Sequence, residues 1–257
     1  LGSQTPHSRP NWRFSVLPYL DQGPVYDKAD FSESFYSACT STSPYGFWKG
    51  QNEHLAGLVI SVFQCPSSPI SDTSIDVVCN FERAQTHDYV GVSGAVLLRT
   101  SNGTCSGQTG HGGTFCRNGM LIPMVSTRIR DVTDGSSNTV IAAEQSGLVD
   151  ERDCRSGHHG GWSGFQNVGV WDVSFYSSIH YPFGTGVTTM LYPINYNVLD
   201  VGTNTSYDAN TVVNSFHSGG INVLFVDGSV HFVSDSADRE LQKRLFSRND
   251  GTPVGEF

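Results

Sequence analysis

The clearest pattern of hydrophobic positions lies near the C-terminal end of the chain. Two apolar runs, 223–226 and 230–233, flank the tripeptide Asp-Gly-Ser at 227–229. Asp-Gly is favoured in tight hairpin turns because the backbone there must reach a positive φ. The pattern therefore predicts a β-hairpin over residues 221–233.

Further strands are predicted upstream, where β-branched and aromatic residues stand between Gly or Asp turns. These segments are 89–98, 121–129, 139–144 and 169–176.

Short helices complete the predicted secondary structure. One is expected over 12–21, where Pro18 limits its length, and another within the apolar stretch 54–63. A third follows Ser236 as N-cap and repeats leucine at a spacing of four near the C-terminus. Together the elements predict one α+β domain over 1–257, with a twisted antiparallel sheet, short helices and long loops held by disulfides.

Composition and charge argue against some structures and some classes of binding partner. Gly at 28 residues and Pro at 11 of 257 favour many turns over long helices. The net charge of −9 argues against nucleic acid and anionic lipid as partners, because both attract clustered Lys and Arg. An acidic surface suits hard cations such as calcium, or serves only to keep the protein soluble.

Six scattered cysteines without a C-x-x-C pair favour three disulfides in an oxidising compartment, and hence a secreted or cell-surface protein. Cys105 and Cys116 bracket a Gly-rich loop and are the most plausible pair. The other pairs are guessed as Cys39 with Cys65 and Cys79 with Cys154; the alternative is that some are buried free thiols. No apolar run is long enough to span a bilayer, so contact with a membrane would need a helix preceding Leu1.

Oxygen-bearing side chains gather around one predicted turn. Asp131, Asp134, Asn138 and Glu144 supply the ligand type that calcium prefers, although their spacing does not match an EF-hand loop. The alternative is that Asp134 begins a turn, Ser136 or Asn138 caps the next segment and Glu144 pairs inside the fold. Calcium is therefore the one cofactor that the sequence suggests.

His217 precedes the hairpin and has the alternative roles of metal ligand, partner of Glu144 across the sheet, or donor to a backbone carbonyl that orders the loop. No nucleophile elbow, H-E-x-x-H motif, P-loop or dinucleotide fingerprint is present, so no catalytic residue is assigned.

Two weaker signals concern carbohydrate. Trp48, Trp162 and Trp171 would suit a sugar-stacking face, whereas aromatics in such proteins more often form core or subunit interface. Asn102 and Asn204 begin N-x-[ST] sequons and are candidate glycosylation sites if the protein is secreted.

Four segments carry a resemblance to a known family. They are 12–22 (WRFSVLPYLDQ), 128–139 (RIRDVTDGSSNT, followed by Glu144), 217–222 together with 225–230, and 245–251 (LFSRNDG). The third contains the motif residues His217, Gly219, Gly220, Asn222, Asp227 and Gly228. In content and order these segments resemble the planctomycete-type family of secreted, prepilin-like proteins with a domain of unknown function, related in layout to type IV pilins and type II secretion pseudopilins.

The resemblance implies a pilin-like globular head that normally follows a cleavage-methylation motif and a long apolar helix, which residues 1–257 do not include. Pseudopilins also carry a loop calcium. We therefore expect a structural subunit of an extracellular filament, pilus-like appendage or cell-surface assembly, not an enzyme, whose partners are copies of itself. A carbohydrate-binding or adhesive module is the alternative, and a secreted hydrolase a more distant one.

Overall fold

A mixed five-stranded sheet organises the C-terminal part of the protein. The computed structural model describes residues 8–32, 35, 52–55, 57–75, 83–97, 105, 113–123, 125–155, 161–166, 186–201, 203, 208–252 and 254. The strand order is β7-β4-β5-β8-β9. The strands are β4 (Tyr89–Ala95), β5 (Val140–Glu144), β7 (Val187–Met190), β8 (Gly220–Phe225) and β9 (Val230–Ser234).

The α+β class is confirmed, but the expectation of a purely antiparallel sheet is wrong. β7 lies parallel to β4, whereas the other neighbours in the sheet are antiparallel. Parallel neighbours need a long connection rather than a hairpin, and here the chain runs from Ala95 to Val187 between the two strands. No local turn signal marks such a pairing.

The predicted hairpin is confirmed in β8 and β9. Ile221 pairs with Val233 and Leu224 with Val230. At the turn, Gly228 has φ +88°, and the Asp227 carboxylate accepts hydrogen bonds from the backbone N–H and the hydroxyl of Ser229. The Asp-Gly sequence therefore forms the tight hairpin turn that its chemistry predicts.

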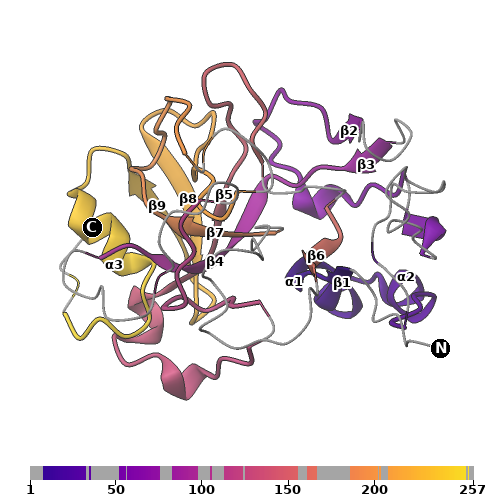
Figure 1. Ribbon diagram of the computed structural model, residues 1–257, viewed down its shortest axis with the longest axis horizontal. Coiled ribbons are helices and arrows are strands. Elements are labelled where there is room, and N and C mark those ends of the chain that lie inside the picture. Colours follow the sequence, from indigo (N-terminus) through magenta and orange to yellow (C-terminus); the bar gives the residue numbers. More distant parts are fainter. Residues whose placement is uncertain are drawn as a thin grey trace.

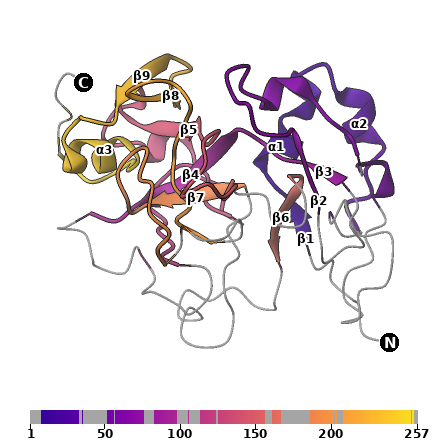
Figure 2. The same cartoon turned by 90° about the horizontal axis from the view of Figure 1, so that it is seen from above.

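The remaining elements are short. Two-stranded pairs join β1 (Ser8–Pro10) to β6 (Ser163–Gln166) and β2 (Thr73–Ile75) to β3 (Arg83–Gln85). The helices are α1 (Trp12–Ser15), α2 (Gly23–Asp27) and α3 (Arg239–Leu245), with 3₁₀ turns at Leu17–Tyr19, Glu53–Leu55, Ser61–Phe63, Ile129–Asp131 and Ser136–Asn138. Figures 1 and 2 show the five-stranded sheet and α3 on one side of the molecule and the elements α1, α2, β1, β2, β3 and β6 on the other.

Three local predictions need correction. The N-cap of α3 is Asp238, whose carboxylate accepts from two backbone N–H groups, and not Ser236. The described part of 121–129, which leaves out residue 124, contains no strand, and a 3₁₀ turn begins at Ile129. The predicted helix over 12–21 divides into α1 and the 3₁₀ turn that contains Pro18. The segment 169–176 lies outside the described residues.

Two apolar clusters lie on the two sides of the molecule. One packs α3 against the sheet through residues such as Leu245, Phe225 and Val233. The other surrounds Trp162, whose ring meets those of Phe14 and Phe63 edge-on. Because Trp162 is fully buried, it cannot offer a sugar-stacking face, while Trp48 and Trp171 lie outside the described residues.

One predicted disulfide, Cys105–Cys116, is confirmed. The pairs Cys39–Cys65 and Cys79–Cys154 are wrong, because Cys65 and Cys154 are buried free thiols. Cys65 lies beside the side chains of Glu144 and His217, whereas Cys154 packs in an apolar cluster with Val149 and Val212. Cys39 and Cys79 are outside the described residues. No helix within the described ranges has the length and apolar character needed to cross a membrane.

Candidate functional site

Three reactive side chains from distant parts of the chain converge over the sheet. His217 Nε2 lies 3.3 Å from Glu144 Oε1 and 3.7 Å from Cys65 Sγ, and this sulfur lies 3.9 Å from the same Glu144 oxygen. Among the described residues, this is the group of His, Cys and acidic side chains whose ligand atoms come close enough to share one metal ion. The predicted meeting of His217 with Glu144 is confirmed.

Glu144 is positioned by the register of the sheet. It ends β5 opposite Tyr89 of β4, and its side chain is only 3% exposed. Asn222 of β8 holds both carboxylate oxygens: its backbone N–H donates to Oε2 at 2.8 Å and its side-chain amide to Oε1 at 3.0 Å. A buried carboxylate needs such donors, since burial without them is costly. The Asn222 hydrogen bonds therefore orient the carboxylate toward Cys65 and His217.

Cys65 follows the 3₁₀ turn Ser61–Phe63 and is anchored through its backbone. Its N–H donates to Asp88 Oδ2 at 2.8 Å. Asp88 is in turn paired with Arg155, whose Nη1 lies 2.7 Å from Oδ1. Burial, the largest influence, raises the pKa of Asp88, against the lowering effect of the hydrogen bonds from Cys65 and Arg155. The backbone of Cys65 is thus anchored to a buried ion pair, whose carboxylate comes from the residue just before β4.

His217 stands on the loop that leads into β8. Its backbone N–H donates to the Ser215 hydroxyl, which itself donates to the Gly220 carbonyl. Gly219 has φ +82°, a conformation that favours glycine, and its carbonyl accepts from Asp235 N–H. The His217 side chain remains 32% exposed. The imidazole therefore forms the solvent-facing wall of the site.

Tyr89 lies beside the site, opposite Glu144 in the sheet. Its pKa is raised to about 12, first by burial and then by repulsion from Cys65, Glu144 and Asp88. A phenolate is therefore disfavoured next to this group of side chains.

One family model covers most of the chain. Residues 1–240 match the model of a family described as "Protein of unknown function (DUF1559)". The chain belongs to this family. The match includes Cys65, Glu144, His217 and both strands of the C-terminal hairpin. Neither the curated proteins nor the solved structures contain a match to this chain.

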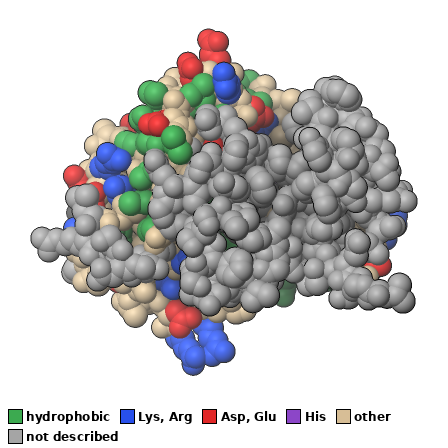
Figure 3. Space-filling model, in the orientation of Figure 1, with side chains coloured by type: hydrophobic (Ala, Val, Ile, Leu, Met, Phe, Trp, Pro, Cys, Tyr) green, Lys and Arg blue, Asp and Glu red, His purple; other side chains and the backbone are tan. Residues whose placement is uncertain are grey.

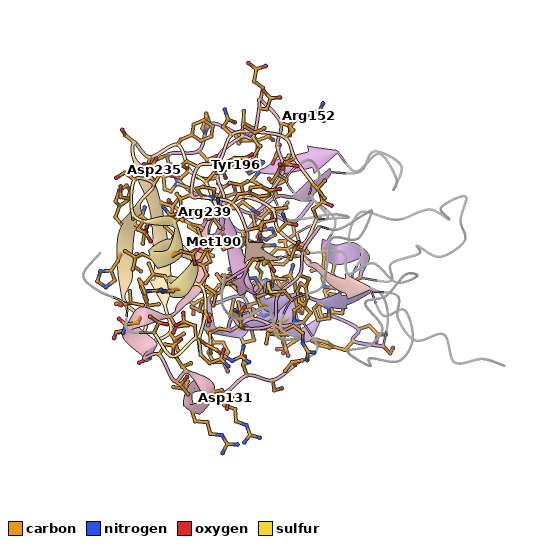
Figure 4. All side chains as sticks on the ribbon, turned by 60° about the vertical axis from the view of Figure 1, so that its left-hand side comes forward. Asp131, Arg152, Met190, Tyr196, Asp235 and Arg239 are labelled. Atoms are coloured by element: carbon orange, nitrogen blue, oxygen red, sulfur yellow. A yellow bond between two sulfur atoms is a disulfide. The ribbon has the colours of Figure 1, made fainter. Side chains whose placement is uncertain are left out.

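The four predicted calcium ligands of this DUF1559 protein are not brought together. Asp134 accepts from the backbone N–H groups of Asp250 and Gly251, and Asp131 accepts from Arg128 N–H. Figure 4 shows Asp131, the last residue of the 3₁₀ turn Ile129–Asp131, at the lower extreme of the view. Glu144 stands at the far end of β5, a strand length of roughly 13 Å from Val140.

Asn138, the fourth predicted calcium ligand, donates its side-chain amide to the Asp134 carbonyl, so it orders the turn. The candidate glycosylation sites Asn102 and Asn204 lie outside the described residues.

A separate pocket of about 350 Å³ lies beside Trp12, Leu121 and Val187. Its lining contains no ionisable side chain. This pocket therefore offers no acid–base group and no charged metal ligand.

Cys65 is the member of the site that the sequence did not reveal. It lies 79 residues from Glu144 and 152 residues from His217 along the chain. Counting cysteines assigned it to a disulfide, and no spacing motif links it to either partner.

Proposed function

We propose that this protein is a secreted structural subunit of an extracellular filament, pilus-like appendage or other cell-surface assembly, with a pilin-like globular head that associates with copies of itself. Support comes first from the sequence resemblance to prepilin-like proteins in four segments that span most of the chain. The Cys105–Cys116 disulfide is compatible with an oxidising compartment. Such a role needs no catalytic residue.

The observation that carries the proposal is an apolar patch on an edge of the sheet. We define the hairpin patch as Leu224, Val230 and Phe232, which are 38%, 64% and 47% exposed. Leu224 pairs directly with Val230, and Phe232 is two positions along β9, so all three side chains share one face. Figure 3 shows hydrophobic side chains gathered on the side where Figure 1 places β8 and β9.

The position of this patch favours association. β9 is the outermost strand of the sheet in the part of the chain that the structure describes. An edge strand offers backbone hydrogen-bonding groups to a further strand, and exposed apolar side chains beside it add hydrophobic burial. A second copy of β9 supplies both features. Antiparallel pairing of two such edges gives an isologous contact that closes a dimer, and a second contact on each copy would join dimers into a larger assembly.

The proposal is tested with the whole natural protein, expressed with any residues that its gene encodes upstream of Leu1. Sedimentation velocity over a range of concentrations and electron microscopy would measure assembly. We expect Val230→Lys to abolish it, because the change places a charge in the hairpin patch. The control is Ile129→Lys, a residue that is 71% exposed on a 3₁₀ turn outside the sheet.

Added salt should strengthen assembly of the wild type by screening the repulsion between chains of net charge −9. A wild-type protein that stays monomeric at every concentration would contradict the proposal. So would equal assembly by the Val230 variant and the wild type.

A further inference from the structure

We propose that Cys65, Glu144 and His217 bind a zinc ion and leave its fourth coordination position open to solvent. This inference goes beyond the structural role proposed above and does not depend on it. It rests on three observations: the spacing of the ligand atoms, the chemistry of the donor set, and the hydrogen bonds that hold the ligands in place.

The spacing matches tetrahedral zinc. At bond lengths of about 2.3 Å to sulfur and about 2.0 Å to nitrogen and oxygen, a tetrahedral ion holds its sulfur about 3.5 Å from the other two ligands, and its nitrogen and oxygen about 3.3 Å apart. The observed separations are 3.7 Å from Cys65 Sγ to His217 Nε2, 3.9 Å from Cys65 Sγ to Glu144 Oε1, and 3.3 Å from His217 Nε2 to Glu144 Oε1. The three atoms thus lie close to three corners of a coordination tetrahedron, and one zinc ion can bind all of them after small movements of the side chains.

The donor set selects the metal. One thiolate, one imidazole nitrogen and one carboxylate oxygen are the ligand types of zinc sites, whereas calcium and magnesium take oxygen almost throughout. The charge balance agrees, because a thiolate and a carboxylate together neutralise a divalent ion. Three protein ligands leave one tetrahedral position for water or an external ligand. That position is accessible from the side of His217, whose side chain is 32% exposed.

The ligands are held before any ion arrives. Asn222 binds both oxygens of Glu144, and Asp88 accepts from the backbone N–H of Cys65. Outer hydrogen bonds of this kind orient metal ligands, and their loss typically costs tenfold to a hundredfold in affinity. Asn222 in particular turns Oε1 toward the sulfur and the imidazole.

Two metal-free roles would also suit this arrangement of side chains. Cys65, Glu144 and His217 could form a hydrogen-bonded polar cluster, or Cys65 and His217 could act as a thiolate–imidazole pair toward electrophiles. Neither role requires a stoichiometric metal. The decisive measurement is therefore metal binding itself.

Purified protein stripped with a chelator, under non-reducing conditions that keep the disulfide, would be titrated with ZnCl₂ by calorimetry and with CoCl₂ by absorption spectroscopy. We expect one ion per chain. With cobalt we expect the thiolate-to-metal charge-transfer band and the intense visible bands of tetrahedral coordination. Calcium should not compete.

Variants locate the site. Cys65→Ser should abolish the thiolate-to-cobalt band and lower zinc affinity at least tenfold, and His217→Gln should lower affinity similarly. Asn222→Ala should weaken binding by about tenfold to a hundredfold. The matched controls are Cys154→Ser, which removes a second buried free thiol of the described residues, and His231→Gln on β9; both should bind zinc like the wild type.

His217→Gln is the main test if Cys65→Ser fails to fold, because His217 is the most exposed of the three ligands and its loss disturbs the core least. Far-ultraviolet circular dichroism of each metal-free variant checks the fold. The inference is overturned if the wild type takes up no stoichiometric zinc, or if His217→Gln binds it as tightly as the wild type. Binding lost in Cys154→Ser but kept in Cys65→Ser would equally overturn it.

Discussion

Replacing Arg155 by methionine should destabilise the protein strongly. Its guanidinium donates to Asp88 Oδ1 at 2.7 Å, to Asp153 Oδ2 at 2.6 Å and to the Ser71 carbonyl at 2.8 Å. The Arg155 and Asp88 side chains are 2% and 1% exposed. Removing one partner of a buried pair leaves an uncompensated charge, which typically costs about 3–5 kcal/mol. Asp153 adds less to this loss, because its side chain is 33% exposed and is stabilised by water.

The assay is urea unfolding of the metal-free, disulfide-intact protein, followed by the fluorescence of its tryptophans, which include the buried Trp162. We expect Arg155→Met to lower the free energy of unfolding by about 3–5 kcal/mol. The double variant with Asp88→Asn should be less destabilised than the sum of the single variants, because the neutral amide no longer needs the cation. A coupling of about 1–3 kcal/mol is expected for such a pair.

The chain offers a matched control on its surface. Arg130 lies 3.9 Å from Asp131, and their side chains are 73% and 44% exposed. Exposed pairs contribute little, so Arg130→Met should change the free energy of unfolding by less than about 1 kcal/mol. The reasoning would be refuted if Arg155→Met cost no more than this control, or if the Arg155 and Asp88 substitutions were strictly additive.

Three further outcomes follow from buried groups and tight packing. Burial, followed by the positive charges of nearby arginines, holds the pKa of His87 well below its ordinary value. As the pH is lowered, the unfolded chain therefore binds the His87 proton before the folded protein does. The free energy of unfolding should decrease below about pH 6.5, by up to about 1.4 kcal/mol for each pH unit. Urea titrations at several pH values should show a smaller slope for His87→Phe. Gly161→Ala would drive its Cβ into the His87 ring and should cost about 3 kcal/mol in the same assay. Gly23→Ala should be nearly neutral, because a Cβ there meets no atom within 4 Å apart from the adjacent residues and the backbone of its own helix. Replacing Cys105 and Cys116 together by serine opens a loop with a sequence separation of 11 and should lower stability by about 3 kcal/mol; unchanged melting and protease resistance would contradict this.

Local chemistry made part of the fold predictable. The hairpin could be predicted because an Asp-Gly turn and its flanking apolar runs act over a dozen residues. β4 and β5 were expected at nearly their true positions, since each presents a run of residues suited to a buried strand. β7 was not predicted, because Val187–Met190 is short and forms a strand only by pairing with β4, which is far away in the sequence. Long-range pairing leaves no local signature.

The candidate site was likewise predictable from the sequence only in part. The pairing of His217 with Glu144 was among the expected alternatives, because both residues flank predicted strands. Cys65 was assigned to a disulfide from the number of cysteines in the chain. This number does not distinguish a cysteine in a disulfide from a free thiol that is buried beside a carboxylate. The proposed calcium set failed for a geometric reason: a strand separates Glu144 from the turn that carries Asp134. Residues close in sequence are held apart once the chain is extended.

The proposed zinc site touches the hairpin through Asn222 of β8, yet the site and the hairpin patch can be tested separately. Asn222, which orients Glu144, stands directly opposite Phe232 of the patch, whereas Val230 pairs with Leu224. A change at Phe232 therefore touches the partner of a zinc-orienting residue, and its effect on assembly would be ambiguous. Val230→Lys alters the patch two pairs further along the hairpin, away from Asn222. Loss of assembly in that variant with unchanged zinc affinity would show that the edge strand acts without the metal, while loss of both would mean that the hairpin transmits the change to Glu144.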